Sequence, residues 1–179
     1  HGIKPALQSV SVLNILRNKS LSNIDLKKPE QVLSALNKNF QMTKANSLYF
    51  SMWYGVFNKE SRLIVYSGAG HPPAILHNGN KKIEYLNSEN KFIGILSEQT
   101  YISRYHYVEP NSSIYLYSDG VFEIDSKDIQ WSIEDMHKLL LSHPEKDGTE
   151  IEQLFIYTKN ISQNNTLKDD FSILKVDIL

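Results

Sequence analysis

Acidic residues at the ends of two apolar segments are the side chains of this sequence best suited to chemistry. Asp119 follows the apolar run 115–117, and the pair Asp169 and Asp170 stands immediately before the run 171–178. Considered alone, an Asp-Gly step is typical of a hairpin turn, and paired acids before a strand are typical of a solvated loop. If the two runs form neighbouring antiparallel strands, however, the end of the first meets the start of the second.

Carboxylates that are brought together in this way repel one another unless a cation lies between them. Hard divalent ions such as Mg2+ and Mn2+ are the ions that clustered oxygen ligands hold. The sequence therefore predicts a metal site to which Asp119 and Asp169 both contribute.

Several other kinds of site are disfavoured. The chain has no cysteine, which excludes disulfides, thiolate zinc sites and cysteine nucleophiles, and it has no G-x-S-x-G motif of a serine hydrolase. His71, His77 and His106 lie on three different segments without the spacing of zinc ligands, so we expect no zinc site. The 19 basic residues form no stripe and are balanced by 20 acidic ones, which disfavours nucleic-acid binding.

A glycine-rich segment, Ser67 to Pro73, looks at first like a phosphate-binding loop. Such loops present backbone N–H groups at the start of a helix, and the step Pro72-Pro73 cannot continue into a helix. We therefore expect a tight turn between two strands, in which His71 is hydrogen-bonded.

The elements that must position these residues change in kind along the chain. Helices are predicted at 5–16, 29–40, 133–142 and 150–161. Strands are predicted at 48–57, 62–67, 74–77, 81–86, 100–108, 112–117 and 171–178. Helices, then a block of antiparallel strands, then helices and a final strand are typical of an α+β layered domain.

The helical segments also carry signals for their period, their inward residues and their starts. The first helix has apolar residues at three- to four-residue steps: Ala6, Leu7, Val10, Leu13 and Leu16. In the last helix, the residues expected to face inward are Ile151, Leu154, Phe155 and Thr158. The third helix should begin after Ser132, an N-cap residue type with Asp135 three positions later.

Length and composition favour a single globular domain. The 179 residues are 41% hydrophobic and 22% charged, with a net charge of -1, which is ordinary for a globular protein. No apolar run is long enough to span a membrane, and the first residues lack the zones of a signal peptide. We therefore expect a cytoplasmic protein.

Seven segments carry a series of motifs along nearly the whole chain. They are His1 to Leu7, Leu36-Asn37, Phe50 to Phe57, Tyr66 to Pro73, Gly94 to Leu96, Tyr115 to Glu123 and Asp169 to Phe171. In this order and spacing, they resemble the SpoIIE/RsbU branch of the metal-dependent (PPM-type) serine/threonine protein phosphatases.

The resemblance implies an αββα sandwich of two antiparallel sheets flanked by helices. It also implies a two-metal Mn2+ or Mg2+ centre at which metal-bound water attacks a phosphoserine or phosphothreonine. Asp119 matches the acid of the family's S/T-D-G motif, and Asp169 matches the first acid of its D-D motif, so both are expected to be catalytic metal ligands. Asp170 is expected to be an auxiliary ligand or to lie just outside the ligand set. The other motif residues expected near the site are His1, Gly2, Gly70, His71 and Gly120.

The family's bridging aspartate lies a few residues before the histidine that His1 matches. The resemblance therefore implies that residues 1–179 are one phosphatase domain without its first strands. A bridging carboxylate holds two ions about 3.5–4 Å apart in such hydrolases. We expect this chain by itself to hold no cation or one weakly bound cation, and to have little activity.

The resemblance also points to partners. It implies a phosphorylated regulatory protein as substrate, of the anti-sigma-factor antagonist type used in bacterial partner switching, and a possible upstream sensor domain. One alternative is a non-catalytic scaffold, or pseudophosphatase, that binds such a partner without turnover. Another is a hydrolase of small phosphate esters.

Overall fold

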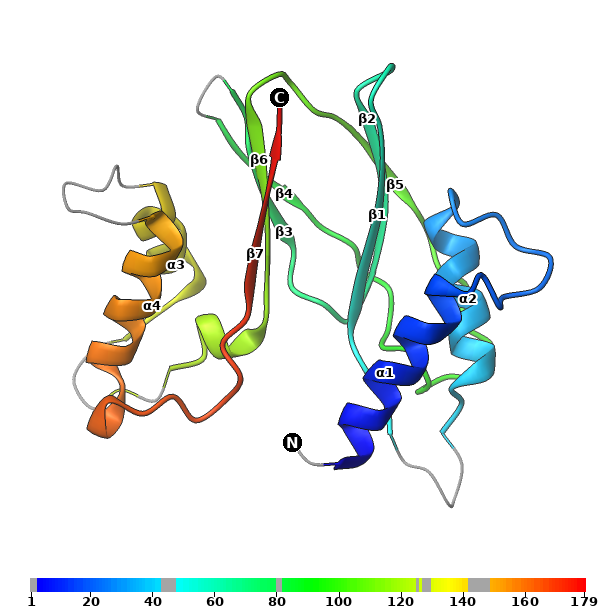
Figure 1. Ribbon diagram of the computed structural model, residues 1–179, viewed down its shortest axis with the longest axis horizontal. Helices are drawn as coiled ribbons and strands as arrows, with labels where there is room; N and C mark the ends of the chain where they lie inside the picture. Colours follow the sequence, from blue (N-terminus) through cyan, green and yellow to red (C-terminus); the bar gives the residue numbers. More distant parts are fainter. Residues whose placement is uncertain (1–2, 43–47, 80–81, 125, 127–129, 142–148) are drawn as a thin grey trace. The chain divides into compact units, whose positions relative to one another are not determined.

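The computed structural model describes residues 3–42, 48–79, 82–124, 126, 130–141 and 149–179 (Figure 1). These residues form helices and two antiparallel sheets, which confirms the α+β prediction. The chain divides into two compact units, one of His1–Ser112 with Ile178–Leu179 and one of Ser113–Asp177.

Two helices open the first unit, α1 (Ile3–Arg17) and α2 (Pro29–Asn39). Pro29 suits the first turn of α2 because its fixed φ is helical and its missing N–H would have no partner there. Glu30 adds a negative charge near the positive end of the helix dipole. Both helices are confirmed close to their predicted bounds.

A three-stranded antiparallel sheet follows, with the order β1-β2-β5. Its strands are β1 (Met52–Asn58), β2 (Leu63–Ala69) and β5 (Arg104–Tyr107). In the turn after β1, the Asn58 side-chain oxygen accepts hydrogen bonds from the backbone N–H groups of Glu60 and Ser61 at 2.9 and 3.0 Å. This side chain closes the β1–β2 connection, as the turn residues predict.

The second sheet has the strand order β4-β3-β6-β7. The first unit supplies the hairpin of β3 (Ala74–His77) and β4 (Ile83–Leu86), in which Ala74 lies opposite Leu86 and His77 opposite Ile83. Its other strands are β6 (Ser112–Tyr117) and β7 (Ile173–Ile178), which lie mostly in the second unit.

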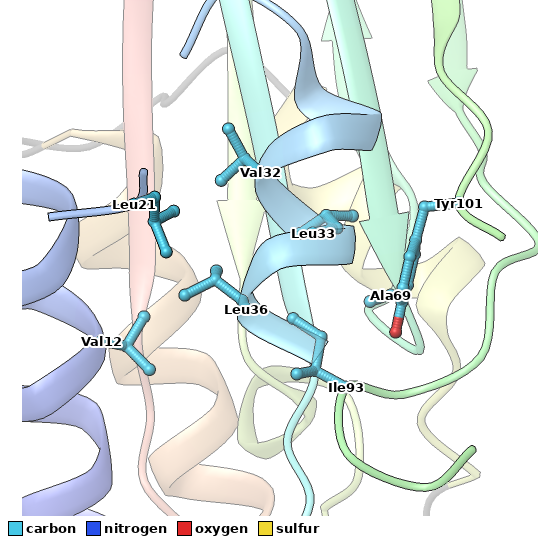
Figure 2. Packing of buried hydrophobic residues seen from close by; sticks show 8 residues of the cluster. All are labelled: Val12, Leu21, Val32, Leu33, Leu36, Ala69, Ile93 and Tyr101. Atoms are coloured by element: carbon cyan, nitrogen blue, oxygen red, sulfur yellow. The ribbon is translucent and has the colours of Figure 1, made fainter. Parts of the chain in front are cut away.

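The core of the first unit gathers side chains from both helices and from the segments around β2 and β5 (Figure 2). Its buried members are Val12, Leu21, Val32, Leu33, Leu36, Ala69, Ile93 and Tyr101. Helix α2 contributes three of them, so this helix is the one most firmly packed on the sheet.

The apolar series that predicts α1 is packed only in part, because Leu16 lies against the core while other members of the series are exposed. Val12 is the one buried residue of this helix, whereas Leu7, Val10 and Leu13 are 62%, 54% and 45% exposed. Apolar residues occur on several sides of α1, so the sequence period alone does not define which side packs.

A buried asparagine fixes the end of α2. The side chain of Asn37 is 2% exposed and makes two hydrogen bonds to one loop. Its Oδ1 accepts from the N–H of Gly94 at 2.8 Å, and its Nδ2 donates to the carbonyl of Leu96 at 2.9 Å. The motif residues Leu36-Asn37 and Gly94 to Leu96 are therefore held together by one side chain.

The second unit places two helices and two short 3-10 helices between its strands. The helices are α3 (Ile133–Leu141) and α4 (Glu150–Ile161), and the 3-10 helices are η1 (Asp119–Val121) and η2 (Gln163–Asn165). Helices α3 and α4 pack against each other. Within α4, Leu154 and Thr158 are buried as predicted, whereas Phe155 is 41% exposed, so its predicted inward orientation is wrong.

Both of these helices begin at capped positions. The Ser132 hydroxyl accepts a hydrogen bond from the N–H of Asp135 at 3.2 Å, as predicted. Thr149 forms a reciprocal capping box with Glu152, a signal that the sequence reading did not use. Each cap satisfies backbone donors that the helix itself leaves unpaired.

A buried tyrosine links three elements of the second unit. Tyr115 of β6 is 3% exposed, and its hydroxyl donates to Glu150 Oε1 at 3.1 Å. Lys175 Nζ of β7 lies 2.7 Å from the same carboxylate oxygen. Burial first, and then the neighbouring Glu150 carboxylate, raise the pKa of Tyr115 to about 12. The hydrogen bond to Glu150 is the main cause that raises the pKa of Lys175.

Within the described ranges, the chain has no helix that is both long enough and apolar enough to cross a membrane.

Candidate metal centre

Asp119 stands at the point where β6 gives way to a tight helical turn. Ser118 is still extended, with φ -81° and ψ 164°, and Asp119 opens the 3-10 helix η1. The Asp119 carbonyl accepts hydrogen bonds from the N–H groups of Phe122 and Glu123 at 3.0 and 2.8 Å. The hairpin interpretation of this Asp-Gly step is therefore wrong, because the chain coils here instead of reversing into a second strand.

Ser118 ties this turn to the segment that precedes β7. Its backbone N–H donates to the carbonyl of Ser172 at 2.9 Å. Its hydroxyl donates to the carbonyl of Asp170 at 2.7 Å and accepts from the N–H of Ser172 at 3.0 Å. The end of β6 and the approach to β7 are thus joined mainly through backbone groups.

Gly120 brings the two acidic segments into direct contact. A Cβ atom built at this position would lie 2.5 Å from the carbonyl oxygen of Asp170 and 3.3 Å from the carbonyl carbon of Asp169. Such an approach leaves room for glycine only. The backbone of Asp119 and Gly120 therefore lies against that of Asp169 and Asp170, as expected from the strand-end argument.

The carboxylates of this pair of segments are oriented by the N–H group that follows each one. Asp119 Oδ1 accepts from the N–H of Gly120 at 3.0 Å, and Asp169 Oδ1 accepts from the N–H of Asp170 at 2.7 Å. Asp119, Asp169 and Asp170 are all exposed. A cation from solvent can therefore reach them.

The donor chemistry of these residues suits a hard divalent ion, because carboxylate oxygens are the ligands that Mg2+ and Mn2+ prefer. Few such ligands lie together, however. In the part of the chain that the structure describes, no group of three or more His, Cys, Asp or Glu side chains is arranged to hold a metal ion. Asp119 and Asp169 therefore remain candidate ligands, in segments whose main chains are in contact.

The remaining predicted site residues belong to the first unit or lie outside the described ranges. His1 and Gly2 are outside them. Gly70 and His71 belong to the first unit, where they form the turn after β2. Gly70 has φ +62°, and a Cβ there would lie 2.6 Å from the ring of Phe92. His71 Nδ1 lies 2.7 Å from the carbonyl oxygen of Pro72, which confirms the predicted hydrogen bond in this turn.

Sequence reasoning missed two features of this region. It did not assign a role to Ser118 or Ser172, although a serine directly before an acid can bond a neighbouring backbone in the way that is seen here. It also did not detect a pocket of about 280 Å3 that Gly120 and Asp169 help to line. Its walls come from segments that are far apart in the sequence, so no local pattern marks it.

Solved structures define the class of fold. The SiaA-PP2C domain of Pseudomonas aeruginosa is similar with a TM-score of 0.82 and 15% identity, over 99% of this chain and 72% of that chain. The PP2C phosphatase domain of SpoIIE from Bacillus subtilis, solved with a fragment of its regulatory domain, has a TM-score of 0.80 and 17% identity, over 99% and 51%. The manganese-presoaked phosphatase domain of SpoIIE has a TM-score of 0.58 and 18% identity, over 93% and 71%. The chain has a PP2C-type fold.

The family match of the amino-acid sequence confirms the resemblance. Residues 1–179 match the SpoIIE family, described as stage II sporulation protein E, and the chain belongs to it. One curated relative is the phosphoserine phosphatase RsbU of Bacillus subtilis (strain 168), which is 26% identical over 147 residues. This match covers 82% of the chain and 44% of RsbU, so the chain spans less than half the length of that relative.

Proposed function

We propose that the chain is the phosphatase domain of a metal-dependent enzyme that hydrolyses phosphoserine or phosphothreonine in a regulatory protein. The observation that carries this proposal is the contact of Gly120 with the Asp169–Asp170 backbone. It joins the two acidic motifs that the resemblance assigns to metal binding. Family membership and the phosphatase activity named for RsbU support the same reaction class.

In this proposal, Asp119 and Asp169 hold the cation, and Asp170 assists from the adjoining position. A bound Mn2+ or Mg2+ supplies Lewis acidity and neutralises phosphate charge during ester hydrolysis. The N–H groups of Gly120 and Asp170 hold one oxygen of each carboxylate, so the chain itself fixes the direction of the remaining donor atoms. The manganese-presoaked structure of SpoIIE supports a divalent cation as the cofactor.

The proposal includes a further acid ahead of His1, as the resemblance implies. A two-metal hydrolase needs a carboxylate shared by both ions, and the described residues supply two acidic segments whose main chains touch rather than a cluster of three acids. We therefore expect the 179-residue chain to release little phosphate, and an upstream-extended protein to be active.

The proposed substrate is a small folded phosphoprotein of the anti-sigma-factor antagonist type. The chain carries a net charge of -1 and has no basic stripe, so long-range charge would contribute little to capture of a phosphate group. Specificity would then depend on contacts between the two proteins. A stressosome structure among the similar folds supports a partner-switching role.

The test is Mn2+-dependent phosphate release by the upstream-extended protein, measured with and without EDTA on a phosphorylated antagonist, an unrelated phosphopeptide and p-nitrophenyl phosphate. Asp119→Asn and Asp169→Asn should each abolish release. Asp25→Asn is the matched control, because Asp25 is an exposed acid of the first unit whose Oδ1 accepts a hydrogen bond from Lys27 N–H. It should leave release unchanged.

Each alternative predicts a different result. Binding of the phosphorylated antagonist without any release would favour the non-catalytic scaffold. Equal kcat/KM on all three phosphate esters would favour a hydrolase of small esters. Release that is unaffected by both aspartate substitutions would show that the ligand assignment is wrong.

A further inference from the structure

Strand β7 forms the outer edge of the second sheet. In the order β4-β3-β6-β7 it pairs with β6 on one side and, among the residues that the structure describes, with no strand on the other. An edge strand presents a row of backbone N–H and C=O groups to any further strand, and proline or a covering segment usually protects it. Residues 171–179 contain no proline. This edge can therefore accept another strand.

The bonds to β6 define which backbone groups point to the open edge. The N–H of Ser118 donates to the carbonyl of Ser172, so the main chain of Ser172 faces β6. Backbone groups alternate in direction along an antiparallel strand. The even-numbered residues of β7 therefore turn their N–H and C=O groups toward β6. The odd-numbered residues, which include Lys175 and Asp177, turn theirs to the open edge.

Charge favours one register for the pairing of this edge with a second copy of itself. In an antiparallel pair, residues that face outward lie opposite residues that face outward. A two-fold axis at Val176 meets this condition, and it places Lys175 of each copy opposite Asp177 of the other. An axis at Lys175 would instead oppose two lysines. Opposite charges stabilise such cross-strand pairs and like charges destabilise them. The strand is thus complementary to itself about Val176.

The same register brings an exposed leucine to an apolar hollow. Leu179 directly follows β7 and is 91% exposed. Residues of α4 and of the start of β7 line a hollow of about 890 Å3, and they include Phe155, Phe171 and Ile173. Pairing about Val176 places Leu179 of one copy opposite Ile173 of the other. Each copy would therefore cover the exposed leucine of its counterpart.

We propose that a second copy of this chain docks on the edge of β7, by antiparallel pairing of the two β7 strands about Val176. The charge pattern and the position of Leu179 both favour a second copy as the occupant. Two six-residue strands make a small interface, and small interfaces are typical of weak, reversible association. The inference goes beyond the proposed phosphatase function and uses none of its metal ligands.

A single introduced cysteine tests the register, because the chain has no cysteine of its own. Cα atoms of a non-hydrogen-bonded antiparallel pair lie about 4.5 Å apart, within the roughly 4.4–6.8 Å that a disulfide spans. Val176→Cys should therefore give a disulfide-linked dimer in a glutathione buffer, detected by non-reducing electrophoresis.

Leu174→Cys is the matched control for this variant. Leu174 lies on the same strand and is more exposed than Val176, at 55% against 41%. In the proposed register, however, the two copies of Leu174 are offset by four residues, or about 13–14 Å. This variant should stay unlinked. Equal linking of the two variants would overturn the inference.

Substitution of Leu179 tests the surface without touching the strand. The mass of the unchanged chain, followed by light scattering, should rise with concentration from 20.6 kDa toward twice that value. Leu179→Glu should weaken association at least about tenfold. Leu96→Glu is the matched control, because Leu96 is 46% exposed and belongs to the first unit, and it should associate like the unchanged chain. Urea unfolding verifies that both variants are folded. A single-chain mass at every concentration would overturn the inference.

A strand from an upstream segment is the competing occupant of this edge. The upstream-extended protein carrying Val176→Cys separates the two possibilities. A disulfide-linked dimer of this protein would support the second copy. A monomeric, unlinked extended protein would assign the edge to the upstream segment and overturn the inference. Neither result depends on phosphate release, so the proposed phosphatase function stands or fails separately.

Discussion

A methyl group at position 120 tests the contact between the two acidic segments directly. A Cβ there lies 2.5 Å from the carbonyl oxygen of Asp170, and 3.0 and 3.3 Å from the carbonyl carbons of Asp170 and Asp169. Carbon atoms in favourable contact are about 3.5–4.0 Å apart. All three neighbouring atoms are backbone, so no side chain can rotate away. In Gly120→Ala, the two segments must therefore separate by roughly 1 Å.

The size of the effect follows from this forced shift. Overpacking that moves the backbone lowers the free energy of unfolding by about 1–3 kcal/mol. In a chain of this length, each kcal/mol lowers Tm by about 2–4 °C. The separation also stretches the 2.7 Å hydrogen bond from the Ser118 hydroxyl to the Asp170 carbonyl. Loss of such support around metal ligands lowers affinity by about 10- to 100-fold, and we expect Mg2+ binding by the upstream-extended protein to weaken within that range.

The assay compares urea unfolding and calorimetric Mg2+ titration for Gly120→Ala and for Gly68→Ala as a matched control. At Gly68, the nearest atoms to a built Cβ are side-chain atoms of Ser88 and Trp53 at 3.3 and 3.4 Å, which can shift by a few tenths of an ångström. We expect the control to change stability by less than about 1 kcal/mol. If Gly120→Ala proves no more disruptive than Gly68→Ala in either measurement, the packing argument for the acidic segments is wrong.

Three further changes test other parts of the structure. Asn37→Ala leaves the N–H of Gly94 and the carbonyl of Leu96 without their partner, and should lower stability by about 1–3 kcal/mol in urea unfolding; an unchanged midpoint would contradict this. Ultraviolet titration should show Tyr115 ionising near pH 12, with a stability contribution that is complete below pH 10 and lost as pH rises toward 12; since the pKa of Tyr101 is also raised to about 12, Tyr115→Phe should reduce the amplitude of this step by one tyrosine. Thr149→Ala removes the capping box of α4 and should lower stability by about 1 kcal/mol, whereas Thr149→Ser should retain it.

The order and type of the elements could be predicted because each carries a local signal. The period of apolar residues changes from helical to alternating after the second helix, and Pro29 and Ser132 mark helix starts through their own backbone chemistry. The terminal strand is confirmed for the same reason, since its burial alternates from Ile173 to Lys175. These signals depend on residues that are close in sequence, so they survive without knowledge of the tertiary fold.

The errors arise where long-range packing decides the outcome. Val12, not Leu13, is the buried residue of α1, because the neighbouring elements and not the helix period select the packed side. The Asp-Gly step at Asp119 coils into η1, because Ser118 bonds the segment before β7 instead of a hairpin partner. Proximity of the acidic motifs was predictable from strand ends, whereas the pocket beside them was not, since its walls meet only after folding.

The bonds between the acidic segments have a consequence for how this region can vary. Ser118 reaches the carbonyls of Asp170 and Ser172 through its hydroxyl and its backbone N–H, and Gly120 touches the main chain of the facing segment. Most of these partners are main-chain atoms, which every residue type provides. Side chains at 170–172 can therefore change with little effect on the alignment. An insertion or deletion of one residue within 118–120 or 169–172 would instead shift every bond by one position and separate the acids, so spacing within these segments is constrained more tightly than composition.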